Sequence, residues 1–138
     1  MRKITLLTAA LAISLVAMAQ AMSGTYKVGT AEVSPNFTSL SAAVTALNAN
    51  GVSGDVVLEI TSDLTETGGI KLLVATMGSS TITIKPAATL TPTITFTACV
   101  TTAGATAYTG FGLDNTNNVI IDGSNALNGV TKDLTFKM

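Results

Sequence analysis

The 138-residue chain has no histidine, no tryptophan and one cysteine, and its only arginine is Arg2. Histidine is the usual general base near neutral pH, and arginine is the usual bidentate clamp for anions. Tryptophan and tyrosine commonly form the rigid platforms of binding sites, yet the chain has only Tyr26 and Tyr108. These absences disfavour an enzyme. From the sequence we assign no catalytic, cofactor-binding or metal-binding residue.

The lone cysteine, Cys99, can form neither an intramolecular disulfide nor a cysteine-based metal cluster. It lies in the apolar run Phe96–Val100, so we expect a small buried core residue rather than a reactive thiol. A nucleic-acid partner is also disfavoured, because phosphate binding needs clustered lysine and arginine. Removing Arg2 and Lys3 with an export signal leaves five lysines against eight acidic residues, a net charge of −3.

The first 21 residues have the pattern of a cleavable secretory signal peptide. Arg2 and Lys3 precede an uncharged apolar run from Ile4 to Met18. Two overlapping small-x-small cleavage sites follow, one ending at Ala19 and the other at Ala21. The apolar run is shorter than the roughly 20 residues that a membrane-spanning helix needs. We therefore expect a secreted or cell-surface protein, with no membrane span after cleavage.

One amphipathic helix is predicted over about residues 39–50. Thr38 or Ser39 can cap its N-terminus, and the apolar residues recur at helical spacing on one face. Asn50-Gly51 supplies the left-handed residue at which helices commonly end. The apolar face consists of Leu40, Ala43, Val44 and Leu47.

The rest of the chain reads as short strands rich in β-branched residues and separated by turn-forming residues. The steps between strands are too short for crossover helices, which excludes a doubly wound α/β sheet. An all-β solenoid of about two coils and an antiparallel β-sandwich remain, and the very short strands favour the solenoid. The predicted strands are Thr25–Val28, Val56–Ile60, Ile70–Val74, Thr81–Lys85, Thr93–Thr97, Phe111–Leu113, Val119–Ile121 and Leu134–Phe136.

Two segments carry a resemblance to a known family. Phe37-Thr38-Ser39-Leu40 leads into the predicted helix, and Asn118-Val119-Ile120-Ile121-Asp122-Gly123 follows later. This pattern resembles the N-terminal part of secreted right-handed parallel β-helix proteins of the pectin-lyase-like type. It is most similar to the large surface proteins of Bacteroidetes-type bacteria.

The resemblance implies that a leading helix caps the open end of the β-helix and that the Asp-Gly pair closes a coil corner. It also implies that residues 22–138 form the N-terminal part of a β-helix domain, truncated after the last strand. An uncapped strand at that edge predicts marginal stability or self-association.

Three groups of polar residues are candidates for a site. Paired carboxylates serve polysaccharide lyases and hydrolases of the β-helix class, but here solvated strand and turn acids are the stronger interpretation. These acids are Asp55, Glu59, Asp63, Glu66, Asp114 and Asp122. The segment from Asp114 to Asp122 is rich in oxygen ligands for Ca²⁺, yet Val119 and Asn125 stand where an EF-hand needs glycine and glutamate. Ordinary turn chemistry explains the segment better.

The third group is an alternating threonine array. It comprises Thr91, Thr93, Thr95 and Thr97, with Thr81 and Thr83 expected on an adjacent strand. Such an array can bind ice on solenoids of another family, or bind glycans weakly, although threonine also simply suits strands. A glycosylation sequon, Asn36-Phe37-Thr38, is attributed to coincidence, with Thr38 as a helix cap.

Three functions remain open. The leading one is a non-catalytic secreted or cell-surface scaffold, in adhesion or in contact with extracellular polysaccharide. The first alternative is part of a carbohydrate-active β-helix enzyme, a polysaccharide lyase or hydrolase whose catalytic coils are missing. The second alternative is a threonine-faced module that binds a ligand such as ice.

Overall fold

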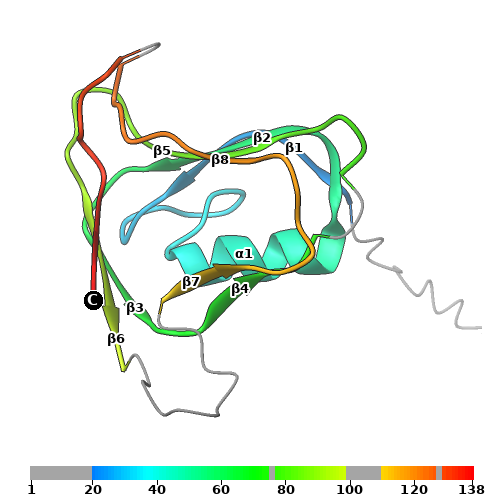
Figure 1. Cartoon of the computed structure of the whole chain (residues 1–138), viewed down its shortest axis with the longest axis horizontal. Helices are drawn as coiled ribbons and strands as arrows, with labels where there is room; N and C mark the ends of the chain where they lie inside the picture. Colours follow the sequence, from blue (N-terminus) through cyan, green and yellow to red (C-terminus); the bar gives the residue numbers. More distant parts are fainter. Residues whose placement is uncertain (1–19, 75–76, 99–109, 127–128) are drawn as a thin grey trace, which may run out of the picture.

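The computed structural model describes residues 20–74, 77–98, 110–126 and 129–138. Within these ranges the chain forms nine strands and one helix (Figure 1). In chain order they are β1 (Met22–Val28), α1 (Leu40–Asn50), β2 (Val52–Ile60), β3 (Leu64–Thr67), β4 (Ile70–Leu72), β5 (Ile82–Pro86), β6 (Thr93–Thr97), β7 (Phe111–Leu113), β8 (Val119–Ile121) and β9 (Thr135–Lys137).

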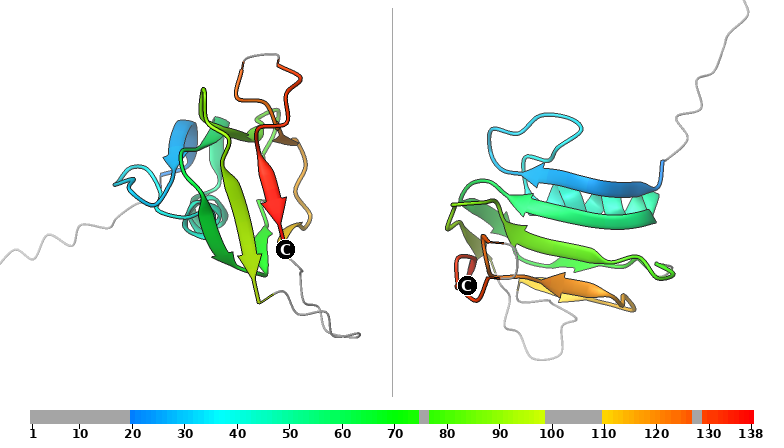
Figure 2. Two further views of the ribbon diagram at one scale, coloured as in Figure 1. Left: turned by 90° about the vertical axis from the view of Figure 1, so that its left-hand side faces the viewer. Right: turned by 90° about the horizontal axis from the view of Figure 1, so that it is seen from above.

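The strands form three sheets that the chain visits in turn. The first sheet has the order β1-β2-β5-β8, the second β3-β6-β9 and the third β4-β7. Every pairing among these strands is parallel, so β2-β3-β4 forms one layer and β5-β6-β7 lies in register on the next. Figure 2 shows this stacking from the side. The parallel pairing excludes the antiparallel sandwich and gives a β-rich, solenoid-like fold with one short helix.

The core lies between the three sheets and is built by alternation of buried and less buried residues along β3, β4, β5, β6 and the second half of β2. In β5, for example, Ile82 and Ile84 are fully buried while Thr83 between them is not. Successive side chains of a strand point to opposite faces, so apolar residues at every second position fill the interior. In-register partners stack in columns, and one such column is Leu58, Ile84 and Ile121.

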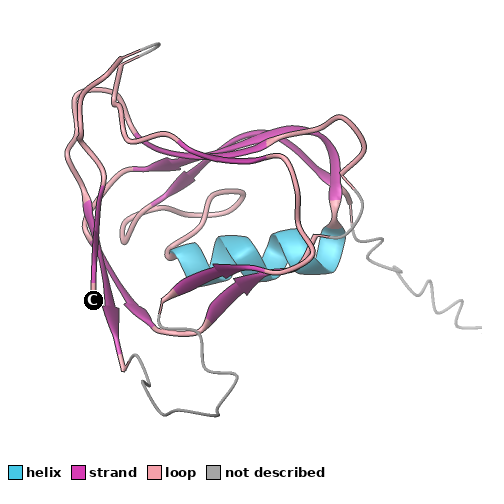
Figure 3. Cartoon of the chain, viewed as in Figure 1, coloured by secondary structure: helices cyan, strands magenta, loops and turns pink. Residues whose placement is uncertain are grey.

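The predicted helix is confirmed. Ser39 Oγ accepts a hydrogen bond from the Ala42 backbone N–H at 3.1 Å, and Gly51 ends the helix with a φ of 68°. The four predicted apolar residues are its buried residues. The helix packs beside β1, β3 and β4, so it covers strand edges that would otherwise lie open (Figure 3).

The strand prediction misses one element and several boundaries. The sequence pattern does not predict β3, because Leu64-Thr65-Glu66-Thr67 places an acidic residue at an inward position. β1 and β2 begin earlier than expected, at Met22 and Val52, whereas β4 ends earlier, at Leu72.

Some expectations fall outside the described residues. Cys99 lies there, as do the first 19 residues of the expected signal peptide. Among the described residues, no helix has the length and apolar character needed to cross a membrane.

Candidate functional site

The outer face of the second sheet carries a regular array of threonines. On β3, β6 and β9, the inward positions hold residues such as Leu64 and Ile94, so the alternate positions face outward. In register, Thr65 lies beside Thr95, Thr67 beside Thr97 and Thr93 beside Thr135. Lys137 follows Thr95 in its row. We call this array of six threonines the threonine face; its members are Thr65, Thr67, Thr93, Thr95, Thr97 and Thr135.

The threonine face differs from the array that the sequence predicted. Thr93, Thr95 and Thr97 do share a face, as expected. Thr83, however, belongs to the first sheet, where its register partners are Val57 and Ile120. The neighbours of Thr95 come instead from β3 and β9, far away in the chain. The alternation Leu-Thr-Glu-Thr in β3 was the signal that could have revealed half of the array.

The spacing of the threonine face follows from the parallel ladder. Neighbouring strands lie about 4.8 Å apart, and alternate residues of one strand about 6.7 Å apart. Each threonine contributes a methyl group and a hydroxyl that can donate and accept. One hydroxyl is engaged within the protein, because Thr97 Oγ1 donates to the Glu66 carbonyl at 3.2 Å. The array can therefore present hydroxyls and methyls at regular intervals to a ligand.

Three of the candidate aspartates accept backbone N–H groups: two of them join segments of the fold, and the third closes a local turn. Asp55 Oδ1 accepts from the Thr81 backbone N–H, and Asp63 Oδ1 accepts from that of Thr93, each at 2.8 Å. Asp122 Oδ1 accepts from the Ser124 N–H at 2.9 Å. In the first two cases a carboxylate satisfies the N–H at the entry to a strand of the following layer.

Glu59 occupies a different setting from these aspartates. It stands between Lys27 and Lys85 in the parallel register of the first sheet. Opposite charges on neighbouring strands stabilise such a row modestly. This position accounts for the acid without a catalytic role.

Glu66 is an acid whose role the sequence did not reveal. Its side chain points inward, is 2% exposed, and accepts from the Leu40 N–H at 2.5 Å and the Ser41 N–H at 3.4 Å. These donors lie in the first turn of α1, where backbone N–H groups lack helical partners and a negative group is favourable. Glu66 therefore ties β3 to the start of the helix. Ser39 caps the same turn, so two side chains share the helix N-terminus.

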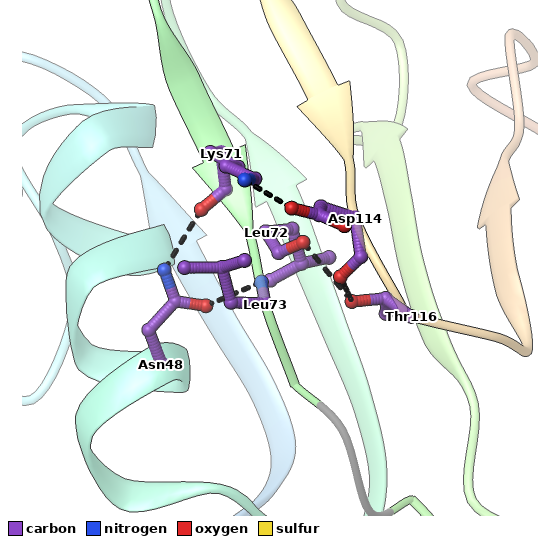
Figure 4. A network of polar contacts seen from close by, with 6 residues as sticks. All are labelled: Asn48, Lys71, Leu72, Leu73, Asp114 and Thr116. Atoms are coloured by element: carbon purple, nitrogen blue, oxygen red, sulfur yellow. Dashed lines mark hydrogen bonds and ion pairs between the residues drawn. The ribbon is translucent and has the colours of Figure 1, made fainter.

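The segment that begins at Asp114 is held by contacts with β4 (Figure 4). The Asp114 carboxylate forms an ion pair with Lys71, and Thr116 Oγ1 donates to the Leu72 carbonyl at 3.0 Å. On the other side of β4, the Asn48 side chain of α1 accepts from the Leu73 N–H and donates to the Lys71 carbonyl, both at 2.8 Å. The described residues contain no cluster of three potential metal ligands.

A second polar corner forms around Asp133. Its carboxylate accepts hydrogen bonds from the Thr131 hydroxyl and from the Asn125 backbone N–H. These bonds, the one from Thr131 first, lower the pKa of Asp133 below its ordinary value. Asn36, from the sequon, is likewise structural, because its Oδ1 accepts from the Lys27 N–H at 2.9 Å.

Comparison of the chain with protein-family models, with curated proteins and with solved structures gives no match. The resemblance to pectin-lyase-like surface proteins therefore stays a prediction.

Proposed function

We propose that this chain is a non-catalytic, secreted or cell-surface scaffold, built as a right-handed parallel β-helix, that contacts extracellular polysaccharide. The observation that carries the proposal is the threonine face, with Thr65 beside Thr95 and Thr67 beside Thr97 in register. A sugar chain presents hydroxyl groups along its length, and threonine hydroxyls can donate to them and accept from them. The signal-like leader, which implies export, places the protein where such polymers occur.

The fold and the acids support the scaffold interpretation over the enzymatic one. The repeated visit to three parallel sheets supports a solenoid, in which each layer contacts mainly its neighbours. Asp55, Asp63 and Glu66 use their carboxylates to accept backbone N–H groups. Carboxylates that hold the fold together in this way are poor candidates for a paired acid and base.

Binding is expected to be weak and distributed over many contacts. The threonine face has no aromatic side chain on which a sugar could stack, so hydrogen bonds supply most of the affinity. Several copies displayed together on a surface would raise the overall avidity without new contacts.

Thr95→Lys should reduce binding to insoluble neutral polysaccharides by about 3- to 10-fold, since it removes contacts worth about one hydrogen bond. Co-sedimentation with such polymers measures the bound fraction. Thr83→Lys is the matched control, because Thr83 is also an outward, partly buried threonine on a central strand, but of the first sheet. Equal loss in both variants, or no binding by the parent protein, would contradict the proposal. Cleavage of polygalacturonate, with or without Ca²⁺, would favour the enzymatic alternative instead.

The same face supports ice as a second candidate ligand, because its Thr-x-Thr rows repeat in register on adjacent parallel strands. A rigid array with two fixed spacings can match a crystal lattice, whereas isolated threonines cannot. We expect the parent protein to inhibit ice recrystallisation and Thr95→Lys to lose that inhibition, with Thr83→Lys retaining it. A parent protein without effect on ice crystal growth eliminates this candidate and leaves polysaccharide binding untouched.

A further inference from the structure

The first layer of the fold contains a pocket of about 360 Å³. It lies between β1, α1 and the loop that joins them, in the blue and cyan part of the chain in Figure 1. Every residue that lines it falls within 20–50, so later strands take no part in building it. We call it the first-layer pocket and define it by Ser23, Tyr26, Ser34, Phe37 and Asn50.

Two aromatic rings lie together in the lining of the first-layer pocket. The ring centroids of Tyr26 and Phe37 are 5.6 Å apart, and the ring planes are tilted by 47°. Both rings are partly buried and pack against the hydrophobic core, so they are held in place while part of their surface stays accessible. An aromatic ring in this setting offers a flat apolar contact area to a ligand.

The polar side chains of the pocket have no partner within the described part of the chain. The hydroxyls of Ser23, Ser34 and Tyr26 form no hydrogen bond there. The side-chain amide of Asn50 forms none within those same ranges. Each hydroxyl can donate and accept, and the amide offers one acceptor and two donors. A ligand with several hydroxyl groups could therefore bond to this pocket without displacing a contact of the fold.

The elements around the pocket are fixed to one another by backbone hydrogen bonds. The Phe37 N–H donates to the Lys27 carbonyl, and the Gly29 N–H donates to the Phe37 carbonyl, both at 2.9 Å, which holds the loop against β1. The Met22 N–H donates to the Gly51 carbonyl, also at 2.9 Å, and joins the start of β1 to the end of α1. A pocket that is formed before its ligand arrives loses less binding free energy to ordering.

We infer that the first-layer pocket binds one pyranose unit of a neutral glycan. A pyranose ring has apolar C–H groups on its faces and hydroxyls around its rim, and the pocket combines aromatic rings with unbonded hydroxyls and an amide. Its volume lies near the lower end of the range for small-molecule sites, which suits a ligand of one ring.

The lining also sets the charge of the ligand. The described residues that line the pocket include no charged side chain, so an anionic sugar would lose hydration there without gaining a counter-charge. The inference does not rest on polysaccharide binding by the threonine face, because that face lies on the second sheet.

The test is saturation-transfer difference NMR on protein expressed from the whole chain, with the methyl glycosides of glucose, galactose and mannose and with methyl glucuronide. We expect weak binding of at least one neutral glycoside and none of methyl glucuronide. Phe37→Leu removes one ring but keeps an apolar side chain, and it should raise the dissociation constant at least about threefold. Phe111→Leu is the matched control, because Phe111 is also partly buried against the core but lies on β7. The control should bind like the parent protein.

Two-dimensional NMR of the unmodified protein gives a second measurement that no folding defect of a variant can disturb. The ring signals of Tyr26 and Phe37 should shift as the bound glycoside is added, while those of Phe136 should not. Thr95→Lys should bind the glycoside like the parent protein, because Thr95 lies on β6. A parent protein that binds none of the neutral glycosides would overturn the inference, as would equal binding of methyl glucuronide. Equal loss in Phe37→Leu and Phe111→Leu, or loss in Thr95→Lys, would also overturn it.

Discussion

Glu66→Ala should lower the free energy of unfolding by about 2–3 kcal/mol, since it removes the acceptor of a buried N–H and part of a helix cap. The Leu40 backbone nitrogen lies 2.5 Å from Glu66 Oε1, and Glu66 as a residue is 2% exposed, so water cannot easily replace the carboxylate. The variant would also loosen α1 from β3, because the carboxylate is the polar link between them. Urea denaturation followed by circular dichroism measures the change.

Two further variants separate the bonding role of Glu66 from mere burial. Glu66→Gln keeps an oxygen acceptor of nearly the same shape and should lose about half as much stability, because the remaining bond is neutral rather than charge-assisted. Thr67→Ala, at the exposed neighbouring position, should change stability by no more than about 0.5 kcal/mol. A Glu66→Ala protein as stable as Thr67→Ala would show that Ser39 alone caps the helix.

Ile84→Ala should cost about 2–5 kcal/mol, whereas Ile121→Ala should cost about 1 kcal/mol or less in dilute protein. The two isoleucines are register partners in one column, with Leu58 on the other side of Ile84. Ile84 is fully buried between neighbours in adjacent layers, and Ile121, on β8, is 49% exposed. The same substitution in the same column therefore measures how much a covering layer contributes. Thermal or urea unfolding of both variants at low concentration checks this. Equal costs for both variants in dilute protein would contradict the exposure difference between the two positions.

Local patterns in the sequence were sufficient for the helix and for most strands. The helical spacing of Leu40, Val44 and Leu47, with Ser39 before them and Gly51 after, identifies α1 without any tertiary information. The short alternating runs likewise predicted β5, β6 and β8 to within a residue or so at each end. These elements depend on propensities and periodicities that act over a few neighbouring residues.

The sequence predicted only part of the threonine face. Alternation predicts that Thr93, Thr95 and Thr97 share a face, but it cannot say which strands flank them. Thr83, which is closer in sequence, lies in another sheet, and Thr65 is the actual neighbour of Thr95. In a stacked parallel fold, neighbouring strands are separated in the sequence by all the residues of one layer. That number of residues depends on the loops of the layer as well as on its strands.

The sequence by itself determined the parts that obey local rules: a helix with its caps, short alternating strands, and a surface poor in catalytic side chains. Only the tertiary structure decided that Glu66 points inward to cap a helix 26 residues earlier in the chain, and that Asn48 closes the edge of β4. It also decided which threonines share a face. The physical reason is that a polar group satisfies its hydrogen bonds with whatever the fold brings near, and the sequence pattern around a glutamate or asparagine does not record that partner.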